Sequence, residues 1–175
     1  AASDVYKRQP NKDGNQTLIV RDGDFSAELE VNVSHGSARR LAISSSTPLD
    51  QITADDEIIL NAMWEDIRGN RWSANSTWEV DDTVTGLNSS IGESVLFDAS
   101  IQGLITVSAE ANDPITPSII RTASISFVVQ SGRLISLEIS GHSLTIPVDV
   151  PFDLNPQGFD ADGNPVDLTG LEWSI

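Results

Sequence analysis

The stretch that decides the fold is TASISFVVQSGRLISLEIS, residues 122–140. It repeats SAELEVNVSHGSARRLAIS, residues 26–44, at a constant offset, and many of the positions that differ keep their chemical character. Six aligned pairs are identical: Ala27/Ala123, Val33/Val129, Gly36/Gly132, Leu41/Leu137, Ile43/Ile139 and Ser44/Ser140. A repeat of this length predicts a string of similar small domains along one chain.

A second pair of segments extends the repeat. IILNAMWEDIRGN, residues 58–70, overlays FDLNPQGFDADGN, residues 152–164, and Trp78 then overlays Trp173. The identical pairs are Leu60/Leu154, Asn61/Asn155, Asp66/Asp160, Gly69/Gly163 and Asn70/Asn164. The shared pattern Asp-x-x-Gly-Asn is typical of a tight strand connection, in which glycine takes a positive φ and aspartate caps the turn.

The hydropathy pattern has a period of two almost everywhere. Apolar and polar residues alternate over residues 27–33, 58–64, 105–109 and 123–129. Such alternation places one face of a strand on a core and the other in water. We predict an all-β chain of tandem antiparallel immunoglobulin-like β-sandwiches, one complete and two truncated.

The overlay also predicts where the units lie. Residues 10–36 are expected to be the last strands of a truncated repeat, 37–132 a complete sandwich, and 133–175 the first strands of another truncated repeat. In the complete unit we expect strands near 39–45, 56–64, 74–80, 94–99, 103–111 and 121–130, with 81–92 as a loop or weak edge strand. The joins carry no Pro-rich or Ser-rich linker, which favours a semi-rigid rod.

The first nine residues, AASDVYKRQ, are expected to be disordered and foreign to the native protein. They resemble the translation of the adapter used in transposase-based DNA library preparation. We therefore leave residues 1–9 out of the fold prediction.

Composition excludes several classes of protein. The chain has no cysteine, so it has neither disulfides nor a thiolate site. Its net charge of −16 is spread along the chain, which argues against nucleic-acid binding and fits a well-solvated surface. No apolar run approaches the roughly 18 residues of a membrane helix, so we predict no membrane insertion by this region.

The order of features resembles a known family. Leu-Ala-Ile at 41–43, the turn at 66–70, Trp78 and Gly-Leu-Ile-Thr-Val-Ser-Ala at 103–109 follow one another as they do in bacterial and archaeal immunoglobulin-like repeats of surface proteins, of the invasin-like and group 2 type. The cysteine pair of antibody domains is missing, and the only tyrosine is Tyr6, which leaves no tyrosine corner. The resemblance implies extracellular stalks, adhesins or accessory modules rather than an enzyme.

The candidate core and catalytic residues follow from these patterns. We expect Trp78 to occupy the central tryptophan position of an immunoglobulin-type sandwich, and Trp173 to repeat it. The predicted core residues are Trp78, Trp173, Leu60, Ile105, Val107 and Phe127. Neither His35 nor His142 lies at a ligand or triad spacing, and no Gly-x-Ser-x-Gly motif occurs, so we predict no catalytic residue and no cofactor.

Two weaker site hypotheses stay open. Asp160 and Asp162 begin like a calcium loop, but the position where an EF-hand places its bidentate glutamate is Leu171. Acidic groups near the joins, Glu138 and Asp153, offer another calcium hypothesis, although we predict no metal.

An aromatic platform for sugar is the second hypothesis. Trp64 is in phase with Leu60 and Ala62, so it is expected in the core. Trp72 lies in the strand connection and is the better candidate for a sugar contact.

Together these features predict a non-catalytic structural or adhesive spacer region of a large extracellular or cell-surface prokaryotic protein. Its expected partners are the neighbouring repeats of the same chain and a cell-surface glycan or protein. The alternative is an accessory, weakly carbohydrate-binding module of a secreted polysaccharide-degrading enzyme.

Overall fold

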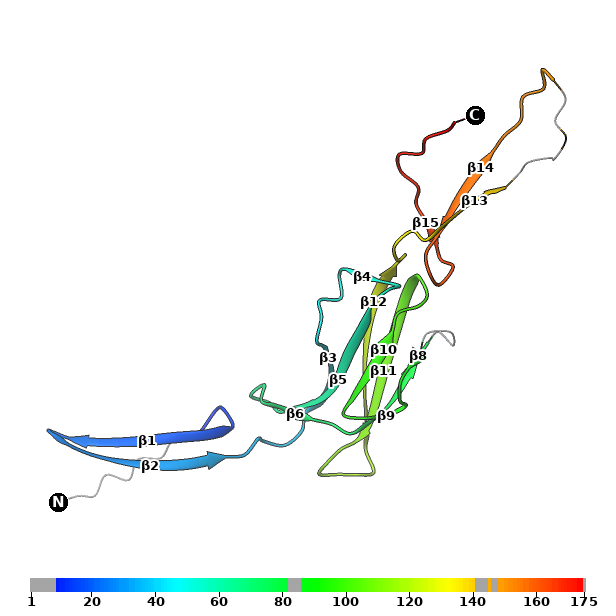
Figure 1. Ribbon diagram of the computed structural model, residues 1–175. Coiled ribbons are helices and arrows are strands. Elements are labelled where there is room, and N and C mark those ends of the chain that lie inside the picture. The colour runs from blue at the N-terminus through cyan, green and yellow to red at the C-terminus, as the bar shows by residue number, and fades with distance from the viewer. Residues whose placement is uncertain (1–8, 82–85, 141–144, 146–147, 175) are drawn as a thin grey trace.

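The computed structural model describes residues 9–81, 86–140, 145 and 148–174, and within them the chain is all-β without a helix. In the part of the chain that is described, therefore, no helix could cross a membrane. The strands form four sheets: a hairpin, two packed five-stranded sheets, and a three-stranded sheet. Figure 1 shows the hairpin and the three-stranded sheet at opposite ends of the central pair.

The hairpin consists of β1 (Gly14–Asp22) and β2 (Phe25–Val33), which pair antiparallel. Gly23 forms the turn with φ 56°, a left-handed conformation that glycine adopts without strain. The alternation predicted for this segment is present, yet the side chain of Leu29 is 61 % exposed. The hairpin therefore has an apolar face that no other described strand covers.

The central unit is a sandwich with immunoglobulin-type strand order. The first sheet runs β3 (Arg40–Ser45), β5 (Glu57–Glu65), β10 (Ser94–Asp98), β8 (Gly86–Leu87), with β6 (Arg71–Ser73) paired to β5. The second runs β4 (Ile52–Thr53), β12 (Ile120–Gln130), β11 (Gly103–Asn112), β7 (Ser76–Val80), β9 (Ile91–Gly92). Pairing is antiparallel except between β4 and β12, which run parallel. These two sheets match the split between strands ABED and CFG in immunoglobulin folds.

The strands lie close to the predicted ranges, within about two residues at each end. The expected loop or weak edge at 81–92 contains two short edge strands, β8 and β9, and its residues 82–85 lie outside the described part. The predicted segment 1–9 also lies outside it, except for Gln9.

The core of the sandwich is built around Trp78, whose side chain is 2 % exposed and whose indole N–H donates to the Gly92 carbonyl at 2.9 Å. Four other predicted core residues are buried in the same cluster: Leu60, Ile105, Val107 and Phe127. Phe97 meets the ring of Phe127 edge to face, with centroids 5.5 Å apart. The inward faces of both sheets thus supply one continuous core.

Trp173 differs from the prediction, because its side chain is 57 % exposed and it lies in no strand. The equivalent Trp78 lies on β7, which pairs with β11 inside a five-stranded sheet of the sandwich. Among the described residues no strand pairs with the segment of Trp173 in this way, so its side chain stays in contact with solvent.

The outer sheets are structural copies of parts of the sandwich. β13 (Ser136–Ser140), β14 (Asn155–Phe159) and β15 (Pro165–Val166) pair in the same order as β3, β5 and β6. Leu137 pairs with Gly158 where Leu41 pairs with Trp64, so the register is also the same. The hairpin copies β11 and β12 in the same way, since Gly14 pairs with Val33 where Gly103 pairs with Val129.

We expect the full chain to self-associate, or to be trimmed by protease to about residues 37–132. The reason is that both outer sheets expose apolar side chains, and uncovered apolar strand faces and edges invite association. The exposed side chains are Leu18, Ile19, Val20, Phe25 and Leu29 in the hairpin, and Leu137 and Ile139 in β13. Limited proteolysis with mass spectrometry, and light scattering, measure both outcomes. A monomeric chain that resists protease over its whole length would contradict this expectation.

Candidate functional site at the two junctions

The two Asp-x-x-Gly-Asn turns each lie at the end of a sheet, next to the preceding unit. Asp66–Asn70 connects β5 to β6, and Asp160–Asn164 connects β14 to β15. Gly69 and Gly163 take φ values of 82° and 85°, which explains why both positions are glycine. In each turn the aspartate N–H donates to the asparagine carbonyl, at 3.1 Å and 3.0 Å.

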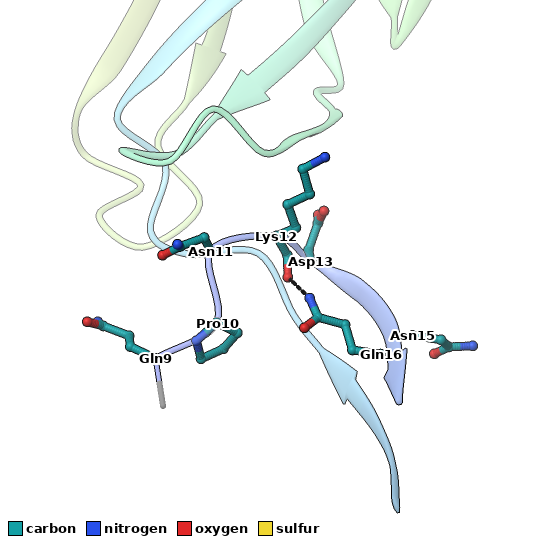
Figure 2. A pocket seen from close by; sticks show the side chains of 7 residues that line it. All are labelled: Gln9, Pro10, Asn11, Lys12, Asp13, Asn15 and Gln16. Atoms are coloured by element: carbon teal, nitrogen blue, oxygen red, sulfur yellow. Dashed lines mark hydrogen bonds between the residues drawn. The ribbon is translucent and has the colours of Figure 1, made fainter. Parts of the chain in front are cut away.

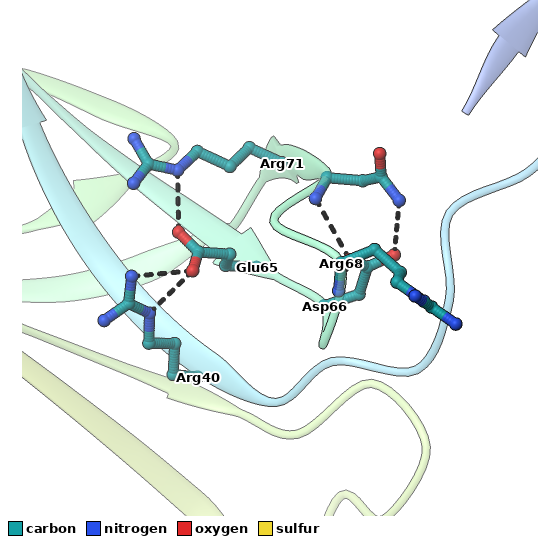
Figure 3. A network of polar contacts seen from close by, with 6 residues as sticks. Arg40, Glu65, Asp66, Arg68 and Arg71 are labelled. Atoms are coloured by element: carbon teal, nitrogen blue, oxygen red, sulfur yellow. Dashed lines mark hydrogen bonds and ion pairs between the residues drawn. The ribbon is translucent and has the colours of Figure 1, made fainter. Parts of the chain in front are cut away.

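The Asp66 carboxylate is buried and accepts four hydrogen bonds. Its Oδ1 accepts the N–H groups of Arg68 (2.8 Å) and Asn70 (3.0 Å), and its Oδ2 accepts the Asn70 Nδ2 group (2.8 Å). The fourth donor is the N–H of Gly36 at 2.8 Å, which belongs to the segment between the hairpin and β3. Figure 3 shows Asp66 and Arg68 in this turn, with dashed hydrogen bonds at the Asp66 carboxylate. One carboxylate therefore orders its own turn and also ties down the connecting segment.

Asp160 repeats this arrangement at the second junction. Its Oδ1 accepts the N–H groups of Asp162 (3.1 Å) and Asn164 (2.7 Å). Its Oδ2 accepts the Asn164 Nδ2 group (2.9 Å) and the N–H of Gly132 (2.8 Å). Gly132 occupies the place of Gly36 in the segment between β12 and β13. The same four contacts thus recur wherever one unit joins the next in the described chain.

These hydrogen bonds set the charge of both aspartates. The bond from the Asn70 amide is the main cause that holds the pKa of Asp66 well below its ordinary value, and it outweighs the effect of burial. Burial alone raises the pKa of Asp160, but the bonds from Asn164, Gly132 and Asp162 together outweigh burial and lower it. Both carboxylates are therefore ionised at neutral pH, which charge-assisted hydrogen bonds require.

The connecting glycines make close approach to the carboxylates possible. A Cβ atom on Gly36 would lie 3.0 Å from Asp66 Oδ2. A Cβ atom on Gly132 would lie 2.6 Å from Asp55 Oδ1, and the Asp55 carboxylate also accepts the N–H of Arg133 at 2.7 Å. The identity of these two glycines in the sequence repeat is therefore explained by the junction rather than by the strands.

Glu65, beside the first turn, binds two arginines on the outer surface. Arg40 and Arg71 approach its carboxylate oxygens at 2.6 Å and 2.8 Å, as Figure 3 shows. The hydrogen bond from Arg71 is the main cause that lowers the pKa of Glu65. Both arginines are largely exposed, so these pairs contribute little to stability.

Trp72, the candidate sugar contact, lies on β6 and is half-buried against the core. The imidazole of His35 stacks on its ring, with centroids 3.7 Å apart and planes 7° from parallel. A sugar would have to displace His35 to stack on that face. Trp64 pairs with Trp72 across the hairpin and is itself buried in the core.

The candidate calcium residues do not converge on a common point. Both oxygens of Asp160 accept N–H groups of the protein, while Asp162 is exposed and contributes only its backbone N–H to the turn. No group of three or more acidic or histidine side chains with metal-binding geometry occurs within the described residues. His142 lies outside them.

We expect millimolar calcium to leave the thermal unfolding midpoint of the chain unchanged. Calcium needs six to eight oxygen ligands, and the oxygens of Asp160 are already used by N–H donors. Calorimetry with calcium, compared with the same chain in a chelator, measures the effect. A rise of several degrees would mean preferential binding to the folded state and would overturn this expectation.

Several cavities of the described structure lie along the hairpin. One of about 420 Å³ is lined by residues 9–13, 15 and 16, shown in Figure 2. Its only charged side chains are Lys12 and Asp13, and its lining offers no set of nucleophile, base and acid. The segment that lines this cavity belongs to the first junction, because Asn11 and Asp13 form hydrogen bonds with Asn70 of the junction turn.

We expect both junctions to stay intact from neutral pH down to about pH 4, and to open as the pH falls further. The pKa values of Asp66 and Asp160 are lower in the folded chain than in the unfolded one. Their contribution is therefore complete above the unfolded value and is lost as pH falls through the folded value.

Hydrogen exchange of the Gly36 and Gly132 amides measures this loss at each junction separately. Unfolding of the whole chain would not separate the two junctions from other groups. The pKa of Asp113 in the β11–β12 turn is also lowered, chiefly by hydrogen bonds from the backbone of Thr116 and Ile115. Asp66→Asn is the control, since the neutral amide cannot titrate. Equal pH sensitivity of the Gly36 amide in this variant would contradict the assignment.

Sequence reasoning identified the turns but missed their second role. The connecting glycines and the turn asparagines were signalled only by their identity between repeats, at Gly36/Gly132 and Asn70/Asn164. Their partners lie about 30 to 60 residues away in the chain. Local turn chemistry gives no indication of such distant partners.

No protein-family model matches the chain, and no curated protein matches it as a relative. Among solved structures, it is similar to domains 1–6 of the surface layer protein SbsC, with 18% identity and a TM-score of 0.38, and to domains 4–9 of that protein, with 16% identity and a TM-score of 0.35. These matches cover 88% and 89% of this chain, but only 20% and 25% of the solved chains.

Proposed function

We propose that this chain is a non-catalytic spacer region of an extracellular or cell-surface protein, in which successive β-sandwiches are held in a defined orientation. The observation that carries the proposal is that both junctions use the same hydrogen bonds, from a connecting glycine to a buried aspartate of the next unit. A spacer needs such contacts, because they resist bending between the units that they join.

The connecting segments support the proposal, because each is hydrogen-bonded to its neighbours at more than one residue. After Gly36, the N–H of Arg39 donates to the backbone carbonyl of Glu65 at 2.8 Å. After Gly132, the N–H groups of Arg133 and Ile135 donate to Asp55 and Phe159 at 2.7 Å and 2.8 Å. Segments attached at several points transmit orientation, whereas flexible linkers do not.

The surface supports an exposed location. A net charge of −16 favours a well-solvated surface. Stability comes from packing, since the chain has no cysteine for disulfides. The distal partner of such a spacer would be a glycan or a protein at the cell surface.

Two measurements test this function. Antibodies against the chain should label intact cells that produce the protein, and labelling only after permeabilisation would contradict a surface location. Small-angle scattering of the monomeric fraction of the chain, separated by size exclusion, should fit a single extended arrangement of its units. Scattering that requires a broad mixture of bent and extended forms would contradict a spacer of defined orientation.

The alternative, an accessory carbohydrate-binding module, has less support. Its best candidate residue, Trp72, carries His35 on one ring face and packs against the core. Titration of tryptophan fluorescence with soluble polysaccharides tests it, and a saturable change that is lost in Trp72→Ala would favour the module over the spacer.

A further inference from the structure

We infer that the side-chain amides of Asn70 and Asn164 are binding sites for the backbone of the preceding unit, and that they lock successive units together. This inference rests on the proposed spacer function and names the partner of its junctions. We call each set of contacts a clasp: the turn asparagine, together with the carbonyl of one residue and the N–H of the residue two positions later in the unit before it.

The second clasp has the shorter contacts. Asn164 Nδ2 donates to the Ser100 carbonyl at 3.1 Å, and its Oδ1 accepts the Gln102 N–H at 3.1 Å. Both partners lie between β10 and β11 of the central sandwich, more than 60 residues before Asn164. The asparagine thus pairs with the backbone through both its donor and its acceptor.

The first clasp repeats these contacts in another pair of units. Asn70 Nδ2 donates to the Asn11 carbonyl at 3.4 Å, and its Oδ1 accepts the Asp13 N–H at 3.3 Å. These bonds are longer, but the atoms and their order along the chain are the same. Two independent occurrences in one chain argue against a chance contact.

The backbone that receives the asparagine is itself a repeated feature. Each receiving segment ends at a glycine with positive φ that starts a strand, Gly14 in β1 and Gly103 in β11. The bound carbonyl lies three residues before that glycine, and the bound N–H lies one residue before it. Since β1 copies β11 in register, the receiving segments are equivalent parts of two units.

The turn aspartate orients the side-chain amide of the asparagine toward this partner. One Nδ2 hydrogen is donated to the carboxylate, at 2.8 Å in the first turn and 2.9 Å in the second, and the other is left for the neighbouring carbonyl. An aspartate at this position would have no donor and would place a second carboxylate beside the first. A glutamine would carry its amide one methylene too far. The chemistry therefore selects asparagine.

The central unit carries both halves of the clasp. Its Asn70 binds the unit before it, and its Ser100–Gln102 segment binds the unit after it. Figure 1 shows those two neighbours at opposite ends of the sandwich. A contact of this head-to-tail kind can be repeated without limit along an array. The partner that fits it is any unit with an Asp-x-x-Gly-Asn turn.

The test uses spin labels in the full chain, whose lack of cysteine leaves introduced thiols unique. Labels at Glu110→Cys in the central sandwich and Glu138→Cys in β13 are both on exposed positions. Pulsed dipolar spectroscopy, with the labelled chain diluted into unlabelled chain so that only distances within one chain contribute, should give one narrow distance peak in the parent chain. In Asn164→Ala, which removes both the donor and the acceptor of the clasp, we expect that peak to be lost into a broad distribution.

Hydrogen exchange of an amide in the central unit provides a second test, because that amide lies outside the turn that carries the substitution. The Gln102 amide lies in the central unit, and its N–H donates to Asn164 Oδ1. Its hydrogen exchange should therefore accelerate in Asn164→Ala, which removes this acceptor. The Trp78 amide, bonded to Ser90 in the same unit, should not change. Asn75→Ala is the matched control, because Asn75 is exposed and lines a cavity with residues of β7, β9, β11 and β12 rather than with a junction turn.

The outcomes separate this inference from the spacer function. A narrow distance peak with unchanged Gln102 exchange in Asn164→Ala would overturn the clasp, and the spacer function would then rest on the aspartate contacts. A broad distribution in the parent chain would overturn both. Labelling of intact cells tests the location whatever the clasp does.

Discussion

Replacing Trp78 with alanine is expected to unfold the central sandwich. The side chain is 2 % exposed and lies at the centre of the core, so its removal leaves a cavity that neighbouring side chains cannot fill. Such a substitution costs about 3–5 kcal/mol. The whole stability of a domain is about 5–15 kcal/mol, so this loss is a large share of it and equals all of it at the lower end. The Gly92 carbonyl also loses the indole N–H that it accepts.

Chemical denaturation of the full chain measures this loss, and Trp173→Ala is the matched control. Trp173 is the aligned tryptophan of the next unit, and its side chain is 57 % exposed. We expect its removal to leave the unfolding of the sandwich nearly unchanged. Similar losses in the two variants would show that Trp78 does not organise the core in the way the structure places it.

Replacing Asp160 with alanine is expected to release the three-stranded sheet from the sandwich. The variant removes one acceptor that serves four N–H donors, and hydrogen bonds to a charged group contribute about 1.5–3 kcal/mol each, although such contributions do not add. The donors left behind are the N–H groups of Gly132, Asp162 and Asn164, and the Asn164 amide. Several of them are buried, so leaving them unpaired is costly.

Hydrogen exchange resolved by residue should show loss of protection across β13 to β15, while the core of the sandwich stays protected. Asp162→Ala provides the control, since Asp162 lies in the same turn but its side chain is exposed. We expect this control to behave like the parent chain. Protection of β13 to β15 that survives in Asp160→Ala would contradict the role assigned to the junction carboxylate.

Much of the fold follows from local sequence patterns. Alternation with a period of two marks every long strand of the sandwich, because a strand with one buried face must alternate. Trp78 was identified from its position in that pattern, and the turns at 66–70 and 160–164 from their Gly and Asp residues. These features depend on neighbours in the chain, so the sequence contains the information needed to predict them.

The two-residue strands required the tertiary structure. β4, β8 and β9 are too short to show a period, and β4 is a strand only because the end of β12 lies beside it. The exposure of Trp173 could also be learned only from the tertiary structure. Alternation in a sequence indicates that one face of a strand should be buried, but it does not show whether a second sheet is present to bury it.

The junctions are the clearest case of this division. Sequence comparison determined that Gly36/Gly132, Asp66/Asp160 and Asn70/Asn164 are kept between repeats, and it assigned the aspartates and asparagines to turns. Only the tertiary structure decided that the same side chains also bind the connecting segment and the preceding unit. The physical reason is that a buried carboxylate or amide must satisfy all its hydrogen bonds, and the partners that complete them are brought near by the path of the whole chain.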